Sequence, residues 1–294
     1  MKNKFKSLKT LKSPLVAVLC LILFVYVAII IYLLVWGVYS SFKTRLDFSD
    51  FPLKLPTKWT INNYIAVMQN LSVPVGFTKI VGFFESFCYS VIYAVGSSFF
   101  AVATKLVVAY LCAIYNFRFS KIVYAVVIIT MILPIVGALP AEINIMTELH
   151  LIDTFIGSFF MRANFLGIYF LLFFDFFKKM DKGYIEAAEL DGASDLRVLI
   201  NIAVPIASNL FFTIFLLQFV VFWNEYQVPM VFLESYPTVA YILYRFSADP
   251  SSGVLSGEPA KLAGCVLLLL PILVIFLIFN QRLMTNITVG GLKE

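Results

Sequence analysis

Six long apolar runs limit what this chain can fold into more than any other feature of its sequence. A helix needs about 20 apolar residues to cross a bilayer, and it satisfies its own backbone polar groups there. Each run has about that length or more, so the sequence predicts an all-α polytopic membrane protein with six transmembrane helices. The runs fall at residues 14–38, 86–112, 121–141, 155–177, 207–233 and 262–281.

The composition supports a membrane protein and argues against several other classes. The chain is 61% hydrophobic and only 13% charged, too little charge to cover a water-soluble domain of this length. Its single histidine is His150, and no CxxC spacing occurs, so we expect no metal site and no cofactor on this chain. No phosphate-binding GxxxxGK[ST] loop and no nucleophile–base pairing is visible, so we do not expect an enzyme. The cysteines all lie in apolar runs, which favours small hydrophobes over disulfides: Cys20, Cys88, Cys112 and Cys265.

The distribution of basic residues predicts the orientation of the chain. Five lysines precede the first apolar run, and further Lys and Arg residues follow the second, fourth and sixth runs. Because cytoplasmic loops are enriched in Lys and Arg, we expect both termini in the cytoplasm. The expected parts are a basic N-terminus with the first helix (1–38), an extracytoplasmic loop (39–85), a five-helix core (86–281) containing a cytoplasmic loop (181–205), and a cytoplasmic tail (282–294). In the loop, Pro52 and Pro56 predict turns before a short helix near 61–64.

The cytoplasmic segment 181–205 has the pattern of two short helices separated by a glycine. Tyr184 to Leu190 suits a helix, and Asp191-Gly192 is a helix stop because glycine accepts the left-handed conformation. Ser194 is placed to cap a second helix through its hydroxyl. The spacing of Leu196, Leu199, Ile200 and Ala203 predicts one apolar stripe, and Pro205 a hinge into the fifth span. From spacing alone, an amphipathic loop on the lipid headgroups would fit equally well.

The cytoplasmic segment contains the motif Glu186-Ala-Ala-Glu-Leu-Asp-Gly192-Ala, followed by Ile202-Ala-Val-Pro205. This motif resembles the EAA loop in the permeases of binding-protein-dependent ABC importers, in particular those of the sugar-uptake group. Trp223-Asn224-Glu225-Tyr226 resembles that family's motif of Trp, Asn and an acidic residue. Further matches occur at Tyr110–Phe119, at Leu149–Gly157 and in the tail 280–293.

The resemblance implies a specific division of labour. The chain would form a transport path with a second permease, for a mono- or oligosaccharide delivered by an extracytoplasmic solute-binding protein. Two copies of a cytoplasmic ATPase would bind ATP and Mg²⁺, and ATPase closure would drive alternating access. The coupling residues implied are Glu186, Ala187, Ala188, Asp191, Gly192, Ala193 and Pro205. Without the resemblance, Glu186 and Asp191 could simply keep the loop soluble.

Polar residues within the spans are candidates for function because they are costly in a membrane. We expect Arg162 to snorkel or to face the partner permease. We expect Lys105 to pair with an acid such as Asp175. Otherwise Asp175 would form an ordinary ion pair at the membrane interface with the neighbouring Lys178 or Lys179. A second group of polar side chains fits a carbohydrate passage, although hydrogen bonding between helices would explain it as well. This group consists of Gln218, Trp223, Asn224 and Glu225.

Two alternatives to a sugar importer remain open at this point. The same architecture could import another solute, such as a polyamine or a glycerophosphodiester. An ion-driven secondary transporter would instead show internal repeats with broken helices in matching positions, and no such repeat is visible in the sequence.

Overall fold

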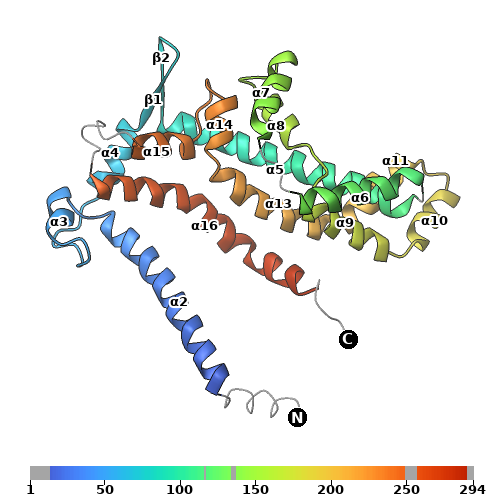
Figure 1. Cartoon of the computed structure of the whole chain (residues 1–294), viewed down its shortest axis with the longest axis horizontal. Helices are drawn as coiled ribbons and strands as arrows, with labels where there is room; N and C mark the ends of the chain where they lie inside the picture. Colours follow the sequence, from blue (N-terminus) through green and yellow to red (C-terminus); the bar gives the residue numbers. More distant parts are fainter. Residues whose placement is uncertain (1–13, 116, 134–136, 249–256, 290–294) are drawn as a thin grey trace. The chain divides into compact units, whose positions relative to one another are not determined.

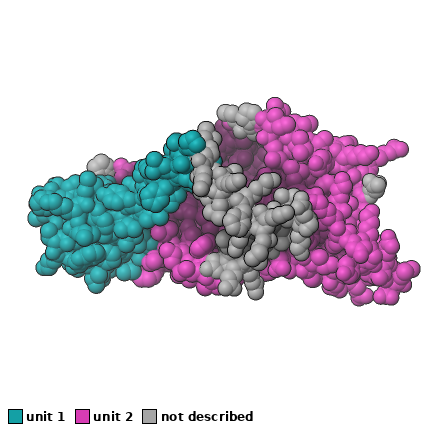
Figure 2. Space-filling model, turned by 90° about the horizontal axis from the view of Figure 1, so that it is seen from below, with its two compact units in different colours: residues 1–70, 249–267 teal, residues 71–248, 268–294 magenta. Residues whose placement is uncertain are grey.

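The computed structural model describes residues 14–115, 117–133, 137–248 and 257–289, and it divides into two compact units. Unit 1 comprises residues 1–70 and 249–267, and unit 2 comprises residues 71–248 and 268–294 (Figure 2). The predicted basic N-terminus before residue 14 and the end of the predicted tail, 290–294, lie outside the described residues. Helices dominate, as the sequence predicts, with one short hairpin of strands.

Unit 1 contains the first apolar run as one unbroken helix, α2 (Pro14–Ser40), followed by α3 (Arg45–Asp50) and α4 (Asn62–Asn70). Helix α4 confirms the short helix predicted in the loop. The chain between α2 and α4 folds around Lys43, which is fully buried. The Lys43 ammonium donates to the carbonyl oxygens of Phe51 at 2.8 Å and Pro52 at 3.1 Å. Its burial lowers the pKa of this ammonium below the usual range.

Unit 2 begins with a hairpin that the sequence did not reveal. Strand β1 (Ser72–Val75) pairs antiparallel with β2 (Lys79–Gly82), with Val73 opposite Val81. The turn contains Gly76 at φ 60°. Lys79 forms an ion pair with Glu85 at 2.6 Å and donates to Tyr89, and these contacts raise the pKa of its ammonium. The hairpin is therefore tied to the start of the following helix.

Helix α5 (Phe83–Ile114) is the axis of unit 2. It runs beside α13 and α9, with the hairpin at its N-terminal end and α10 near its C-terminal end (Figure 1). Its buried face combines small residues with large rings, namely Ala94, Ala101 and Ala109 with Tyr93 and Tyr110. Phe170, Phe173 and Phe177 of α9 are fully buried in the same core as Ala109 and Tyr110. Small residues on α5 let the neighbouring helices approach closely.

The remaining helical elements follow α5 in chain order. They are α6 (Arg118–Ile132), α7 (Ala138–Glu148), α8 (Phe155–Arg162), α9 (Ile168–Lys179), α10 (Gly183–Leu190), α11 (Asp195–Val198), a π-helical turn η1 (Leu199–Ala203), α12 (Val204–Ile206), α13 (Ser208–Trp223), α14 (Gln227–Phe232), α15 (Val239–Ala248) and α16 (Glu258–Val289).

Three of the predicted spans are interrupted in the structure. The run 121–141 is divided between α6 and α7, 155–177 between α8 and α9, and 207–233 between α13 and α14. Two of the breaks contain a glycine with positive φ, Gly137 at 80° and Gly167 at 103°, which a right-handed helix does not accommodate. The predicted continuous helices 121–141, 155–177 and 207–233 were therefore wrong at these points.

Within the described residues, three helices are long and apolar enough to cross a membrane alone. They are Val16–Ser40, Phe83–Ile114 and Glu258–Phe279. The segments Asp195–Ile206 and Ser208–Trp223 would form a fourth span if the two are counted together, with a bend of 73° between them. A membrane protein built on apolar helices is thus confirmed at the level of fold class.

Candidate functional site

The segment after α9 has the predicted helix–glycine–helix geometry. Helix α10 ends at Leu190, and Gly192 follows at φ 77°, the left-handed conformation that the sequence predicted. The Gly192 N–H donates to the Glu189 carbonyl at 3.0 Å, and the Ala193 N–H donates to the Ala188 carbonyl at 2.9 Å. This pair of bonds is the Schellman motif, which satisfies the last carbonyls of a helix. A side chain at position 192 would have to adopt the same strained backbone.

The second helix of the segment begins where predicted but is capped differently. Ser194 occupies the N-cap position with extended backbone angles, yet its hydroxyl makes no cap hydrogen bond. The Ser194 carbonyl instead accepts the first helical bond from the Val198 N–H at 3.0 Å. The π-helical turn Leu199–Ala203 precedes Pro205, which lacks a backbone donor. The chain then bends by 73° into α13, so the predicted hinge next to Pro205 is confirmed.

This segment exposes large apolar side chains, and the predicted apolar stripe is only partly correct. Val198 and Ala203 are buried against α5 and α9, whereas Leu196 and Ile200 are more than half exposed. The stripe was misplaced because the π-helical turn shifts the register of the side chains. Leu190 at the end of α10 is 89% exposed. Glu186, Ala187 and Asp191 are also exposed, so this surface is free in the isolated chain to contact another protein.

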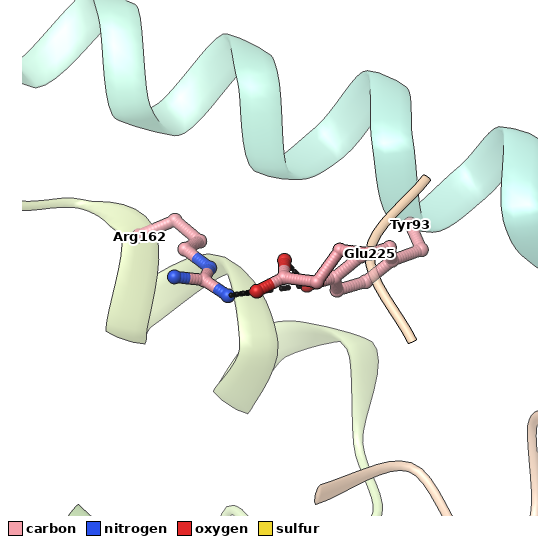
Figure 3. A network of polar contacts seen from close by, with 3 residues as sticks. All are labelled: Tyr93, Arg162 and Glu225. Carbon is pink, nitrogen blue, oxygen red and sulfur yellow. Dashed lines mark hydrogen bonds and ion pairs between the residues drawn. The ribbon is translucent and has the colours of Figure 1, made fainter. Parts of the chain in front are cut away.

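A second site lies inside unit 2, where Arg162, Glu225 and Tyr93 meet. Arg162 from α8 and Glu225, two residues after the end of α13, point toward one another, with Tyr93 of α5 beside them (Figure 3). The Arg162 Nη2 lies 2.5 Å from Glu225 Oε1, and the Tyr93 hydroxyl donates to Glu225 Oε2 at 2.6 Å. The guanidinium also lies 5.0 Å from the centre of the Phe222 ring. The expectation that Arg162 snorkels or faces the partner permease is not met, because the structure pairs its guanidinium with Glu225 of the same chain.

Local structure around α8 sets the position of Arg162. The Thr154 hydroxyl accepts from the Gly157 N–H at 3.0 Å and caps the start of the helix. A Cβ at Gly157 would overlap the Leu151 carbonyl, so only glycine fits this approach. Along α8, the ring of Phe159 lies against Gly96 of α5 and stacks on Phe100 at 5.5 Å. Close packing of α8 on α5 thus fixes where the guanidinium emerges.

Lys105 of α5 reaches the break between α8 and α9. Its ammonium donates to the Ala101 carbonyl at 3.2 Å, to the Asn164 carbonyl at 2.9 Å and to Asn164 Oδ1 at 3.4 Å. The expected Lys105–Asp175 pair was wrong, because Asp175 pairs with Lys179 at 2.7 Å one turn along its own helix. The alternative of an ordinary ion pair for Asp175 is confirmed.

The other residues predicted along a transport path differ in how far they are buried. Asn224 is exposed, and its amide donates to the Val220 carbonyl at 2.8 Å; Gln218 is partly buried. Trp223 is buried at 2% exposure, and its indole N–H donates to the Leu268 carbonyl at 2.9 Å. In this conformation the Trp223 ring is therefore packed against its neighbours, including Phe87 and Phe219. Tyr93 and Asn164 were missed, because Tyr93 is one of 15 tyrosines and Asn164 is a single uncharged polar residue within an apolar run.

Comparison with known proteins identifies the family. The family described as "Binding-protein-dependent transport system inner membrane component" matches residues 105–288, more than half of the chain. The chain belongs to this family. The match runs from Lys105 in the second half of α5 through most of α16, and it includes both the helix–glycine–helix segment and the Arg162–Glu225 pair. The family is one of transporter permeases, and this chain is an ABC importer permease rather than an enzyme.

Curated relatives cover most of the permease at low identity. A protein of Thermoanaerobacterium thermosulfurigenes named "Probable starch degradation products transport system permease protein AmyC" is 25% identical, over 87% of this chain and 89% of its own length. A protein of Streptomyces coelicolor named "Diacetylchitobiose uptake system permease protein NgcG" is 24% identical, over 92% of this chain and 87% of its own length.

A solved structure shares the fold. It is described as the crystal structure of a bacterial ABC transporter involved in the import of the acidic polysaccharide alginate. The TM-score is 0.69 at 22% identity, and the match covers 90% of this chain and 95% of that chain. The permease fold is therefore shown over nearly the whole chain.

Proposed function

We propose that this permease imports a mono- or oligosaccharide, working with a second permease, two copies of an ATPase and a solute-binding protein. The relatives named above are described as permeases for starch degradation products and diacetylchitobiose, which supports a saccharide. ATP and Mg²⁺ would bind to the ATPase, since this chain has no phosphate-binding loop.

The proposal includes the topology predicted from the sequence. The chain crosses the membrane six times with both termini in the cytoplasm, and some of its spans are broken rather than continuous. The first part is 1–38, the extracytoplasmic loop 39–85, the five-helix core 86–281 and the cytoplasmic tail 282–294. Polar groups on and after α13 contribute to the transport path in this proposal, namely Gln218, Asn224 and Glu225, with Trp223 joining them when α13 moves.

One observation supports the coupling role above all others: the exposed helix α10, closed by a Schellman motif at Gly192. Glu186, Ala187 and Ala188 lie along α10, Asp191, Gly192 and Ala193 form its end, and Pro205 marks the bend into α13. In our proposal this segment sits in a cleft of the ATPase. Movement of the ATPase would then be transmitted through the 73° bend to α13 and to the core around α5.

Co-purification from detergent tests this proposal. We expect the tagged native chain to bring down an ATPase and a second permease, and Gly192→Asp with Glu186→Lys to lose the ATPase selectively. The matched control is Gly137→Asp with Glu148→Lys, which makes the same changes at another left-handed glycine and another exposed acid. A native chain that purifies alone and moves solute in liposomes without ATP would contradict the proposal.

A milder variant separates backbone geometry from side-chain chemistry. Gly192→Asn adds a side chain that tolerates the left-handed conformation, whereas Gly192→Val does not. We expect Asn to retain most ATPase binding and Val to weaken it by about tenfold, since the strain costs about 1–2 kcal/mol. Equal binding by the two variants would show that the left-handed turn is not what the partner requires.

A further inference from the structure

The charges inside unit 2 do not balance. Lys105 and Arg162 are both cations, and Glu225 is the carboxylate that pairs with Arg162. Lys105 is only 7% exposed, and its three hydrogen bonds all go to carbonyl or amide oxygens. Among the described residues, no carboxylate lies within ion-pair distance of its ammonium. One positive charge is therefore left without an opposite charge in an apolar region.

The two cations belong to one cluster. Asn164, which accepts from the Lys105 ammonium at 2.9 Å, is only two residues beyond Arg162. Tyr93, which holds Glu225, and Lys105 lie on either side of the midpoint of the 32-residue helix α5. The cluster is thus centred along a helix long enough to cross the membrane.

The cluster also has unused hydrogen-bonding capacity. The Arg162 Nε is buried and has no hydrogen-bond partner, although the side chain as a whole is 23% exposed. The carbonyl end of α8 contributes roughly half a negative charge at most, which does not neutralise a full ammonium charge. Buried polar groups are normally satisfied, so an unpaired donor beside an excess cation requires an explanation. Charged residues within membrane spans commonly mark the path of a substrate.

We propose that Lys105 and Arg162 bind an anionic group of the transported solute, a carboxylate or a sulfate on an acidic saccharide. This inference rests on the proposed import of saccharides and narrows the class of saccharide. Arginine presents a planar fork that matches such a group, and the lysine ammonium supplies a point charge. Glu225 and Tyr93 hold the guanidinium in place, and one bound anion brings the cluster to neutrality.

The physical consequence is a preference for charge. An acidic solute replaces a buried excess charge with an ion pair, whereas a neutral solute of the same shape leaves that charge uncompensated. A hydrogen bond to a charged group favours binding by about tenfold or more over an uncharged equivalent. We therefore expect the importer to favour an acidic oligosaccharide over its neutral ester by at least that factor.

The test compares two solutes that differ only in charge. The complete importer, with its ATPases, second permease and binding protein, is reconstituted in liposomes and supplied with an oligouronide or with its methyl ester. We expect ATP-dependent uptake of the oligouronide, with the ester at least tenfold poorer. Uptake of the ester or of neutral saccharides alone would overturn this inference and leave the proposed import function intact. Uptake of no saccharide of any kind would instead count against the proposed function itself.

Variants then assign the preference to the cluster. Lys105→Met should lower uptake of the oligouronide about tenfold more than it lowers uptake of the ester, while Lys105→Arg should retain the preference. Lys179→Met, the same change at an exposed lysine, should alter neither. An equal decrease in the uptake of both solutes by Lys105→Met would overturn the inference, because Lys105 would then be structural. Loss of the second permease from the purified Lys105→Met complex would overturn it as well, because Lys105 would then pair with an acid of that partner. The solute comparison on the native complex remains decisive if a variant fails to fold.

Discussion

Helices α2 and α5 are both long enough to cross a membrane, but the more hydropathic of the two is the less buried. The window of α2 has a mean hydropathy of 3.2 and none of it is buried, whereas that of α5 has a mean hydropathy of 1.8 and is half buried. Lower hydropathy marks the helix that packs inside the protein. Several of the polar residues that reduce the hydropathy of α5 form hydrogen bonds to other elements, namely Ser90, Tyr93 and Lys105.

This contrast follows from the solvent that each helix meets. Side chains facing lipid need only be apolar, so α2 presents a uniform apolar surface of Leu, Ile, Val and Phe. Helices that pack on one another in a membrane gain from small residues and from hydrogen bonds, because lipid tails compete equally for apolar side chains. Helix α5 has Gly96 beneath Phe159, Ser90 bonded to Val239, and Lys105 at the break after α8.

The largest expected effect comes from breaking the ion pair beside α5. Arg162→Met leaves the Glu225 carboxylate without its cation and should lower the unfolding free energy by about 3 kcal/mol. This value is at the lower end of the range for broken buried ion pairs, because about a fifth of each side chain is exposed. Leu23→Ala on the exposed face of α2 should cost far less. Denaturant unfolding of the purified chain in detergent micelles measures both.

A double variant serves as the control for that prediction. Arg162→Met combined with Glu225→Gln removes the orphaned charge, so it should recover part of the loss. Suppose that Arg162→Met lowers the unfolding free energy no more than Leu23→Ala does. The Arg162–Glu225 ion pair would then contribute nothing to holding α8 on α5, and polar contacts would not explain why α5 is the packed helix.

Glycines offer a matched comparison on the two helices. A Cβ at Gly96 of α5 would overlap the ring of Phe159, while a Cβ at Gly37 of α2 would meet nothing within 4 Å. We expect Gly96→Ala to destabilise by about 2 kcal/mol through overpacking and Gly37→Ala to be neutral or to stabilise by up to about 1 kcal/mol through helix propensity. Melting temperatures of the two variants in one detergent decide the matter; a lower value for Gly37→Ala than for Gly96→Ala would reverse our assignment of the packed helix.

The sequence predicted the continuous helices well and the broken ones poorly. Runs 14–38, 86–112 and 262–281 appear as α2, α5 and α16, because hydropathy over 20 residues reports the need to satisfy the backbone in lipid. The break at 163–167 escaped notice because one Asn and one Gly among apolar residues leave the hydropathy of the whole run high. What interrupts the helix is Gly167 at φ 103° and the hydrogen bond from Lys105 to Asn164, which are tertiary features.

The two candidate sites show the same limit. The end of α10 at Gly192 was predicted correctly, since a helix end closed by glycine is a local event encoded in a few neighbouring residues. The Arg162–Glu225 pair joins residues 63 positions apart, and the sequence offered both charges without indicating that they meet. The expected Lys105–Asp175 pair failed for a related reason: Asp175 found Lys179 one turn away, where pairing costs little chain entropy.

The smallest predicted effect distinguishes two buried serines of α5. The Ser90 hydroxyl donates to the Ser86 carbonyl and accepts from the Val239 N–H at 2.8 Å, whereas the Ser98 hydroxyl donates only to the Ala94 carbonyl of its own helix. Ser90→Ala strands a buried backbone donor at the start of α15 and should cost about 1 kcal/mol or slightly more. Ser98→Ala removes the hydroxyl together with its own hydrogen bond, and the Ala94 carbonyl keeps its helical hydrogen bond. No buried polar group is left unpaired, so this change should be nearly neutral for stability. The measurement is hydrogen exchange at the Val239 amide. Faster exchange in Ser90→Ala, with no change in Ser98→Ala, would show that a polar residue of α5 holds a neighbouring helix in place. Equal exchange in the two variants would mean that these serines lower the hydropathy of α5 without contributing to its packing.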